Sequence, residues 1–453
     1  MINTKIIVTY GPSISSELVL KRVLGYADIM RINFSHGDKK EWLSAVKKVR
    51  SCAKQLRKEI ALFADLPGPK VRVEKMAAPI ILKKGQMVTF CCEGGKDTIA
   101  VSYKGFHLDA RKGAVIEIGD GDARLHIKKI SGKKVIAKAL EDGKISSKKG
   151  VSMLGVSMRL QSPTPTDIEL AKFASKNGFD FVGMSFVNSA KGIKTLRGSN
   201  KEIKIIAKIE RQEAIRKIEE ITNAADVVMV ARGDLAEEVS IERIPEVQRK
   251  IIEVARRAGK PVIVATQLLT SMMNNPTPTR AEVNDIASAV GSGVDCLMLS
   301  DETTVGRYPE EAVKFLVRTI RAAESAMIYS RDERNSDVTT LRGGIALAAV
   351  GLADSYKADC IFIPTKAGTT AKIISMLRPN TQAIALVADN KIGRELAIHY
   401  GIRTSTIKRY RNMEEMLKIV KEVASKNGMK KYIIVSGSPN KPGSTDTLKY
   451  IEA

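Results

Sequence analysis

The stretch IKIIAKIERQEA, residues 203–214, sets two opposite charges within an apolar run. Its aliphatic residues form a run of strand length, and a strand of a parallel sheet is buried on both faces. Lys208 and Glu210 therefore stand where charge is costly. Because side chains two residues apart project to the same side of a strand, the ammonium and the carboxylate can act on one ligand. A plain salt bridge is the structural alternative.

Charged and hydroxyl residues also end or follow other apolar runs: Arg31, Asn33, Asp65, Asp234 and Thr266. Glu210 and Asp234 follow neighbouring predicted strands and can hold one Mg²⁺, which prefers few carboxylates together with substrate oxygens and water. Lys208 and Arg31 then supply positive charge for a phosphate, a combination that suits phosphoryl transfer. In VMVARGDLAEEV the amides of Gly233 and Asp234 are expected to be free for an anion at a helix start. A helix start capped by the Asp is the alternative.

Eight β-rich runs alternate with helical patterns through the first 330 residues, which predicts βα units and a parallel sheet. The runs cover residues 5–8, 29–33, 62–65, 181–185, 205–209, 227–230, 262–265 and 296–299. Eight such units predict an α/β fold with a (β/α)8 TIM barrel, whose active site lies at the C-terminal ends of the strands.

Two segments interrupt or follow this rhythm. Residues 71–155 show Gly-rich turns and alternating strands, which predicts a small all-β domain inserted in a barrel loop as a lid. After a polar bridge at residues 325–335, helix and strand patterns predict a C-terminal α/β domain. The expected division is 1–70 and 156–330 for the barrel, 71–155 for the inserted domain and 336–453 for the C-terminal domain, a candidate regulatory domain.

Composition limits the function classes. The 74 Lys and Arg against 50 Asp and Glu give a net charge of +24, which attracts polyanions. The basic residues are spread along the chain without interleaved aromatics, so we expect no specific nucleic-acid binding and favour phosphorylated small molecules. Five cysteines without paired spacing argue against a disulfide framework or a zinc site. The cysteine pattern fits a reducing cytosol, so a cytoplasmic protein is expected. No apolar run reaches the roughly 18 residues of a membrane helix, so a soluble protein is expected.

Seven motifs in order resemble the pyruvate kinase family, and the similarity extends from TKIIVTYGPS near the start to GSTDTLKYIE near the end. They are MRINFSHG (30–37), DLPGPKVR (65–72), AKIERQEA (207–214), VARGDL (230–235), KPVIVATQLLTSM (260–272), PTRAEVNDIASAV (278–290) and LMLSDET (297–303). The resemblance implies a glycolytic enzyme that transfers the phosphoryl group of phosphoenolpyruvate to ADP, giving pyruvate and ATP. It also implies Mg²⁺, with Mn²⁺ as a substitute, and a homotetramer.

The resemblance assigns roles to the residues at the predicted strand ends. Lys208 would neutralise the transferring phosphoryl group and the enolate, while Glu210 and Asp234 would ligate Mg²⁺. Arg31 would hold the phosphate, and Thr266 would lie near the methylene carbon within a water relay for its protonation.

Other assignments concern the substrate carboxylate, the nucleotide and the last strand. The amides of Gly233 and Asp234 would hold the carboxylate, and Asn33, His36 and Arg72 match positions on the nucleotide side. Two further residues have open roles, in a proton network or in fixing the loop after the last strand: Ser300 and Glu302.

The chain departs from the family at the site of the monovalent cation. Asn33, Ser35 and Asp65 remain, but Leu66 replaces a Thr, Pro67 a Lys and Lys70 a Glu. An internal ammonium can take the role of K⁺, and two positive charges about 4 Å apart repel by roughly 4 kcal/mol at an effective dielectric near 20. We therefore predict activity without K⁺, as in the potassium-independent, archaeal/bacterial-like members. A surface lysine on a loop is the alternative.

The C-terminal domain carries a candidate effector site. TKAGTTAK, residues 365–372, is a hydroxyl- and Gly-rich turn that opens a helix and suits a phosphorylated effector. The candidate residues, beside the late loop SPNKPGSTD (438–446), are Thr365, Gly368, Thr369 and Thr370. An ordinary capped helix is the alternative.

Two rival functions remain open at this point. The first is a Mg²⁺-dependent barrel lyase of the enolpyruvate type, which needs the same metal acids but no ADP. The second is a basic polyanion-binding protein, which predicts tight, salt-sensitive RNA binding without turnover.

Overall fold

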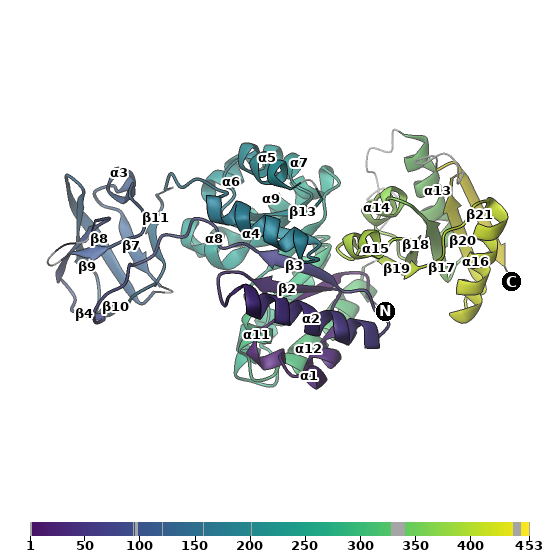
Figure 1. Cartoon of the computed structure of the whole chain (residues 1–453), viewed down its shortest axis with the longest axis horizontal. Helices are drawn as coiled ribbons and strands as arrows, with labels where there is room; N and C mark the ends of the chain where they lie inside the picture. The colour runs from purple at the N-terminus through teal and green to yellow at the C-terminus, as the bar shows by residue number, and fades with distance from the viewer. Residues whose placement is uncertain are drawn as a thin grey trace.

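The computed structural model describes residues 2–93, 95, 98–119, 121–156, 158–200, 202–327, 340–437 and 445–452. Figure 1 shows three bodies in a row, with an antiparallel domain at one end, a barrel in the middle and a sheet-and-helix domain at the other end. The predicted polar bridge and the late loop 438–446 lie mostly outside the described residues.

The barrel consists of eight parallel strands, and all eight match a predicted run. They are β1 (Lys5–Thr9), β2 (Ile29–Asn33), β3 (Ala61–Asp65), β12 (Phe181–Met184), β13 (Lys204–Ile209), β14 (Val227–Ala231), β15 (Val262–Ala265) and β16 (Cys296–Leu299). They close in the order β1-β16-β15-β14-β13-β12-β3-β2. The aliphatic runs predicted this arrangement because both faces of each strand are covered, by the barrel interior and by the outer helices.

Helices cover the outside of the barrel (Figure 1). They are α1 (Glu17–Tyr26), α2 (Lys39–Gln55), α4 (Pro165–Lys176), α5 (Ala190–Ser199), α6 (Gln212–Arg216), α7 (Ile218–Ala224), α8 (Arg232–Glu238), α9 (Ile244–Arg257), α10 (Arg280–Gly291), α11 (Asp301–Thr304) and α12 (Pro309–Ser325). Capping boxes start several of them, as at Asp38 with Glu41 before α2 and at Thr164 with Asp167 before α4. Such caps satisfy amides that the first helical turn leaves free.

The antiparallel domain lies between β3 and β12. Its strands are β4 (Ile80–Leu82), β5 (Met87–Cys91), β6 (Ile99–Ala100), β7 (Val115–Ile118), β8 (Ala123–Ser131), β9 (Lys134–Ala139), β10 (Gly143–Ile145) and β11 (Val151–Leu154). Six of them form a sheet in the order β11-β7-β8-β9-β5-β6, and β10 pairs with β4. The domain has its own apolar cluster. It also contains one helical turn, α3 (Phe106–Asp109), which the all-β prediction did not include.

The C-terminal domain is a five-stranded sheet with helices. Its elements are α13 (Leu341–Ser355), β17 (Cys360–Pro364), α14 (Thr369–Met376), β18 (Ala383–Val387), α15 (Asn390–Leu396), β19 (Ile402–Thr406), α16 (Met413–Lys426), β20 (Lys431–Ser436) and β21 (Thr447–Glu452). The strand order is β19-β18-β17-β20-β21, and β21 runs antiparallel at one edge. This is the predicted α/β domain.

The C-terminal domain docks on the end of the barrel where the strands begin. Arg378 pairs with Asp295, just before β16, at 3.2 Å, and Arg394 Nε lies 2.8 Å from Asp180 Oδ1, just before β12. Ile398 joins the apolar cluster of the barrel interior. The inserted domain leaves the barrel after β3, at the opposite end, so the two smaller domains flank the barrel.

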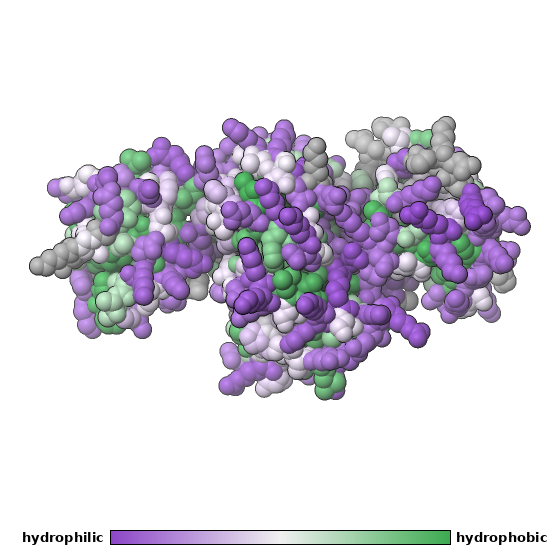
Figure 2. All heavy atoms as spheres, viewed as in Figure 1, coloured by the Kyte–Doolittle hydropathy of each residue, from purple (hydrophilic) through white to green (hydrophobic). Residues whose placement is uncertain are grey.

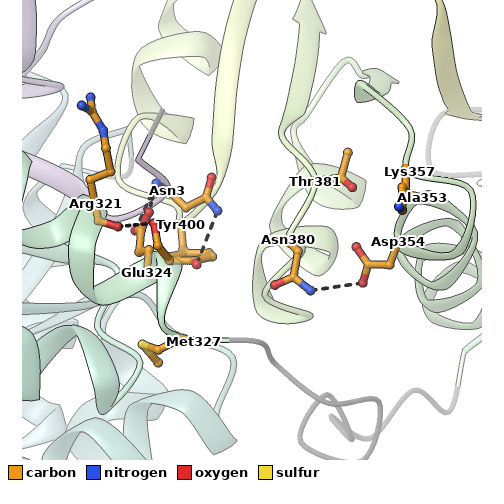
Figure 3. A pocket seen from close by; sticks show the side chains of 11 residues that line it. Asn3, Arg321, Glu324, Met327, Ala353, Asp354, Lys357, Asn380, Thr381 and Tyr400 are labelled. Atoms are coloured by element: carbon orange, nitrogen blue, oxygen red, sulfur yellow. Dashed lines mark hydrogen bonds between the residues drawn. The ribbon is translucent and has the colours of Figure 1, made fainter.

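A cleft of about 550 Å³ marks one side of this junction, and Figure 3 shows residues that line it. On the barrel side Glu324 accepts hydrogen bonds from the backbone amides of Asn3 and Thr4, and Asn3 Nδ2 donates to Tyr400 Oη at 3.5 Å. On the far side Asn380 Nδ2 donates to Asp354 Oδ2 at 3.4 Å. The start of the chain is thereby tied both to α12 and to the C-terminal domain.

Hydrophilic residues are spread over all three bodies on the face seen in Figure 2. Within the described residues, no helix is both long enough and apolar enough for a membrane crossing.

Candidate active site

The buried charges of β13 meet the ends of two neighbouring strands. Lys208 Nζ lies 2.7 Å from Glu210 Oε1 and 3.2 Å from Asp65 Oδ1, at the end of β3. It also donates a hydrogen bond of 2.8 Å to the hydroxyl of Ser185, which follows β12. The side chains of Asp65 and Glu210 are only 3% and 1% exposed, so this ammonium is held by carboxylates largely shielded from water.

Arg31 extends the cluster toward β1. Its Nε and Nη2 lie 2.8 and 2.7 Å from Asp65 Oδ2, and its Nη1 donates to Thr9 Oγ1 at 3.0 Å. Asp65 therefore holds the guanidinium of Arg31 and the ammonium of Lys208 side by side. Two fixed cations at the C-terminal ends of barrel strands can bind a phosphate or stabilise a charge that grows on a reacting oxygen.

Burial and neighbouring charges fix the protonation states. Burial opposes the charge on Lys208, but the carboxylates of Asp65, Glu210 and Asp234 raise its pKa, so it stays protonated. Burial likewise opposes the charge on Asp65, yet Lys208 and Arg31 lower its pKa. For Glu210, burial and the nearby charge of Asp234 together raise the pKa to about 7 against the attraction of Lys208.

Glu210 and Asp234 are the acids that the sequence predicts as Mg²⁺ ligands, and Asp234 is near enough to Glu210 to raise its pKa. Glu210 Oε2 accepts the backbone amide of Phe186 at 2.5 Å, whereas its buried Oε1 contacts the Lys208 ammonium and accepts no well-oriented hydrogen bond among the described residues. Within those residues no group of three or more His, Cys, Asp or Glu side chains is placed to hold a metal. Two carboxylates with room for substrate oxygens and water are the donor set that Mg²⁺ uses at phosphoryl-transfer sites.

The helix start after β14 has one of its two candidate amides engaged within the protein. The amide of Gly233 is not free, because it donates to Thr266 Oγ1 at 2.9 Å. Thr266 itself has a left-handed backbone, with φ of 69°, and its carbonyl accepts two hydrogen bonds from the guanidinium of Arg232. The β-branched Thr266 is strained in this conformation, and strain of this kind is concentrated at functional sites.

Asn33 is the last residue of β2 and is half-buried, and Ser35 and His36 lie on the exposed turn that follows. Asn33 Oδ1 accepts the amide of Ser35 at 3.0 Å, and the carbonyl of His36 accepts the indole N–H of Trp42 at 2.8 Å. These contacts shape the turn, and they do not join it to the cluster around Lys208.

The residues that depart from the family at the cation site are separated. Leu66 is 2% exposed and belongs to the barrel core. Lys70 Nζ lies 3.1 Å from Asp234 Oδ1, with both side chains about one third exposed. Arg72 lies at the entry to the inserted domain, where its Nη1 donates to the carbonyl of Lys148 at 2.8 Å. The ammonium of Lys70 thus faces a proposed metal ligand.

The loop after β16 is held by Glu302, which is buried. Its Oε1 accepts the amide of Leu269 at 3.0 Å and its Oε2 accepts that of Ser300 at 2.8 Å. Of the two open roles, these contacts support the fixing of this loop. The hydroxyl of Ser300 is buried and makes no hydrogen bond within the described residues.

Sequence reasoning missed several residues at the mouth of the barrel. Ser185 and Thr9 are hydroxyl residues at strand ends, so position alone was a usable signal for both. Phe186, whose amide binds Glu210, has a left-handed φ of 54° that no sequence pattern indicates.

The candidate effector residues surround the start of α14. Gly368 has φ of 76° and donates its amide to Thr365 Oγ1 at 3.0 Å, while Thr370 Oγ1 lies 2.6 Å from Thr445 Oγ1. Thr369 is exposed at the first helical position. A Cβ on Gly368 would approach Leu396 to 3.0 Å, so close packing as well as positive φ favours glycine here.

A (β/α)8 barrel with an antiparallel domain after its third strand and paired cations and acids at its mouth defines a class of three-domain barrel enzymes. A family model described as pyruvate kinase, barrel domain, matches residues 1–313, and one described as pyruvate kinase, alpha/beta domain, matches residues 344–451. The pyruvate kinase of Corynebacterium glutamicum is 34% identical over 99% of this chain and 96% of its own length. The pyruvate kinase of Thermococcus litoralis is 32% identical over 99% of this chain and 98% of its own length.

A crystal structure of a pyruvate kinase from Cryptosporidium parvum superposes with a TM-score of 0.92 at 28% identity, covering 100% of this chain and 96% of the other. The chain belongs to the pyruvate kinase family, and it is a phosphotransferase.

Proposed function

We propose that this chain transfers the phosphoryl group of phosphoenolpyruvate to ADP, yielding pyruvate and ATP in glycolysis. The observation that carries the proposal is the contact of one buried ammonium, Lys208, with Asp65 and Glu210 beside the guanidinium of Arg31. This arrangement presents two cations to an anionic substrate at the end of the barrel where such enzymes bind their substrates.

Lys208 and Arg31 perform the electrostatic part of the reaction. Arg31 binds the phosphate of phosphoenolpyruvate, and Lys208 neutralises charge on the migrating phosphoryl group and on the enolate that it leaves behind. Since the pKa of Lys208 is raised, it acts as a fixed charge and not as a proton donor. Thr266 orders the water from which the methylene carbon of the enolate takes its proton.

Glu210 and Asp234 hold Mg²⁺, or Mn²⁺ in its place. When bound, the ion supplies Lewis-acid neutralisation of phosphoryl oxygens. The amide of Phe186 holds the carboxylate of Glu210, and the ammonium of Lys70 contacts that of Asp234. The substrate carboxylate is held by the amides of Gly233 and Asp234, which requires that the hydroxyl of Thr266 release the Gly233 amide.

The nucleotide binds between the turn after β2 and the inserted domain, at Asn33, His36 and Arg72. Closure of the inserted domain over the barrel would bring Arg72 toward this turn.

Activity without K⁺ rests on Lys70, as in the potassium-independent members of the family. Asn33, Ser35 and Asp65 would surround the cation in other members, and here the side chain of Leu66 is turned into the core. The ammonium of Lys70 stands 3.1 Å from Asp234 and supplies positive charge near the proposed metal site. Lys70→Glu is expected to create a K⁺ requirement, whereas Lys75→Glu, the same charge change on an exposed lysine nearby, is not. A many-fold activation of the unmutated protein by K⁺ contradicts this proposal.

Assembly, regulation and location complete the proposed function. The protein forms a cytoplasmic homotetramer, and its C-terminal domain, 336–453, binds a phosphorylated effector at Thr365, Gly368, Thr369 and Thr370. Residues 1–70 and 156–330 act as the barrel unit and 71–155 as the lid.

A coupled assay of pyruvate and ATP formation tests the reaction. We expect Mg²⁺-dependent turnover that requires ADP, and a loss of at least about 10³-fold in kcat for Lys208→Met, because a charge used in the transition state is removed while the side-chain volume is kept. Pyruvate release without ADP, or full activity of Lys208→Met, contradicts the assignment.

A further inference from the structure

A second polar cavity lies at the opposite end of the barrel. It encloses about 310 Å³ and lies between the first residues of β12 to β15 in the barrel and the helices α14 and α15 of the C-terminal domain. Its polar lining is cationic in character and comes from both the barrel and the C-terminal domain: Lys204, Asp226, Lys260, Lys372, Glu395 and His399. A volume at the lower end of the range for ligand pockets suits a small molecule.

The two acids of this cavity are already engaged. Asp226 Oδ2 accepts hydrogen bonds of 2.9 Å from Arg197 Nη2, a residue outside the lining, and from the amide of Ile205. Glu395 Oε2 lies 3.5 Å from Lys204 Nζ. Each carboxylate therefore has another cation as its direct partner and acts on Lys260 and Lys372 through space, where Asp226 raises the pKa of both lysines and Glu395 raises that of Lys372.

Lys260 and Lys372 have no carboxylate partner among the described residues. Lys260 Nζ donates to the carbonyl of Ala225 at 2.7 Å, and the ammonium of Lys372, a half-buried residue on α14, makes no ion pair or hydrogen bond among the described residues. Burial lowers the pKa of both lysines, and the charge of Lys204 lowers that of Lys372 further. Charged groups withdrawn from water without a partner are costly, so the cavity is built for an anion that is brought to it.

His399 adds a neutral imidazole to the same wall. It is 8% exposed, and its ring makes no hydrogen bond with any other described residue. Its neighbours include Lys372, Lys5 and Arg378, whose positive charges disfavour a further cation. A neutral imidazole has one N–H to donate, so it is available as a hydrogen-bond donor to an oxyanion.

We propose that this cavity binds a small phosphate-bearing anion, either inorganic phosphate or a phosphomonoester of a few carbon atoms, held by Lys372, Lys260 and His399. A phosphate offers oxygens in several directions, which matches donors that converge from two domains, and its double charge matches the two lysines that lack a carboxylate. The site is separate from the barrel mouth and from the turn at residues 365–370.

Occupation of this site links the two domains. Lys260 belongs to the barrel, whereas Lys372 and His399 belong to the C-terminal domain, so an anion between them strengthens the docking. Ligand that binds only the folded, docked state stabilises it in proportion to RT ln(1 + [L]/Kd). Lys372 also lies on α14, which follows directly after Gly368, so the anion is in a position to influence that turn.

Inorganic phosphate is the probe, and the imidazole NMR signals of the full-length protein are the readout. The chain has only four histidines, His36, His107, His126 and His399, so the signal of His399 can be assigned by its loss in His399→Gln. The unmutated protein and Lys372→Met are titrated with phosphate at constant ionic strength, with chloride as the salt control. Lys366→Met, an exposed lysine on the preceding turn, is the matched control.

We expect a saturable shift of the His399 signal in the unmutated protein and in Lys366→Met. Lys372→Met should weaken the affinity for phosphate at least about tenfold, because one charged partner of the phosphate is lost. Lys260→Met, the second variant, should weaken binding in the same direction. Lys208→Met tests whether the shift comes from phosphate bound at the barrel mouth. We expect the shift of the His399 signal to persist in this variant. An unshifted His399 signal, or equal shifts with phosphate and chloride, overturns the proposal, as does unchanged affinity in folded Lys372→Met and Lys260→Met.

Discussion

Ser185→Ala tests whether the hydroxyl at the end of β12 positions the ammonium of Lys208. This buried hydroxyl accepts a hydrogen bond of 2.8 Å from Lys208 Nζ and donates one of 2.7 Å to the carbonyl of Leu66. A hydrogen bond to a charged group contributes about 1.5 to 3 kcal/mol, and the unpaired carbonyl adds to the loss, so we expect about 2 to 3 kcal/mol of destabilisation.

The expected thermal shift follows from the size of the barrel. With an unfolding entropy of about 2.1 cal/mol/K per residue over roughly 300 residues, 2 to 3 kcal/mol lowers Tm by about 3 to 5 °C. Because Lys208 loses one of its three fixed contacts, kcat should fall by about 10- to 100-fold while KM for phosphoenolpyruvate changes less. Differential scanning fluorimetry and the coupled assay measure the two effects.

Thr222→Val is the matched control for this experiment. The hydroxyl of Thr222, on α7, is also fully buried, but it makes no hydrogen bond within the described residues. Its isosteric replacement should leave kcat unchanged and Tm equal or slightly higher, because no partner is lost. If Ser185→Ala behaves like Thr222→Val in both assays, Ser185 does not position Lys208 and the reasoning is refuted.

Three further perturbations follow from buried or tightly held charges. Asp65→Asn should lower the free energy of unfolding by about 3 to 5 kcal/mol, because Arg31 and Lys208 lose a shared buried carboxylate. The double variant Asp65→Asn with Lys208→Met should recover part of this loss, as measured by urea unfolding. Burial, followed by nearby cations, lowers the pKa of His399 to about 3, so its stabilising effect is complete above pH 6.5 and is lost as pH falls toward 3. His399→Gln should therefore reduce the slope of stability against pH below 6.5 by up to about 1.4 kcal/mol per unit, and an unchanged acid limb contradicts this. Glu324→Ala should lower Tm, because it removes the acceptor of the first amides before β1, while Glu242→Ala on the exposed segment before α9 should not.

The amino-acid sequence determined the barrel because its signal is local. Each of the eight strands is an aliphatic run long enough to be covered on both faces, and each run was visible without any knowledge of its neighbours. The contact between Lys208 and Glu210 was also predictable, since the two-residue period of a strand places both side chains on one side. The short elements β4, β6, β10 and α3 had no comparable signal, because they are held by pairing within the inserted domain.

Tertiary structure alone decided which residues from distant strands meet. Asp65 and Lys208 are far apart in the chain, and only closure of the barrel brings β3, β12 and β13 side by side so that one carboxylate can serve both Arg31 and Lys208. Pairing of neighbouring strands likewise places the hydroxyl of Thr266 where it accepts a hydrogen bond from the Gly233 amide, which the sequence analysis expected to be free. The same holds for Lys260 and Lys372, which face one cavity only after two domains have docked. Periodicity fixes what a residue does within its own strand or helix, whereas contacts between elements depend on packing that no local pattern records.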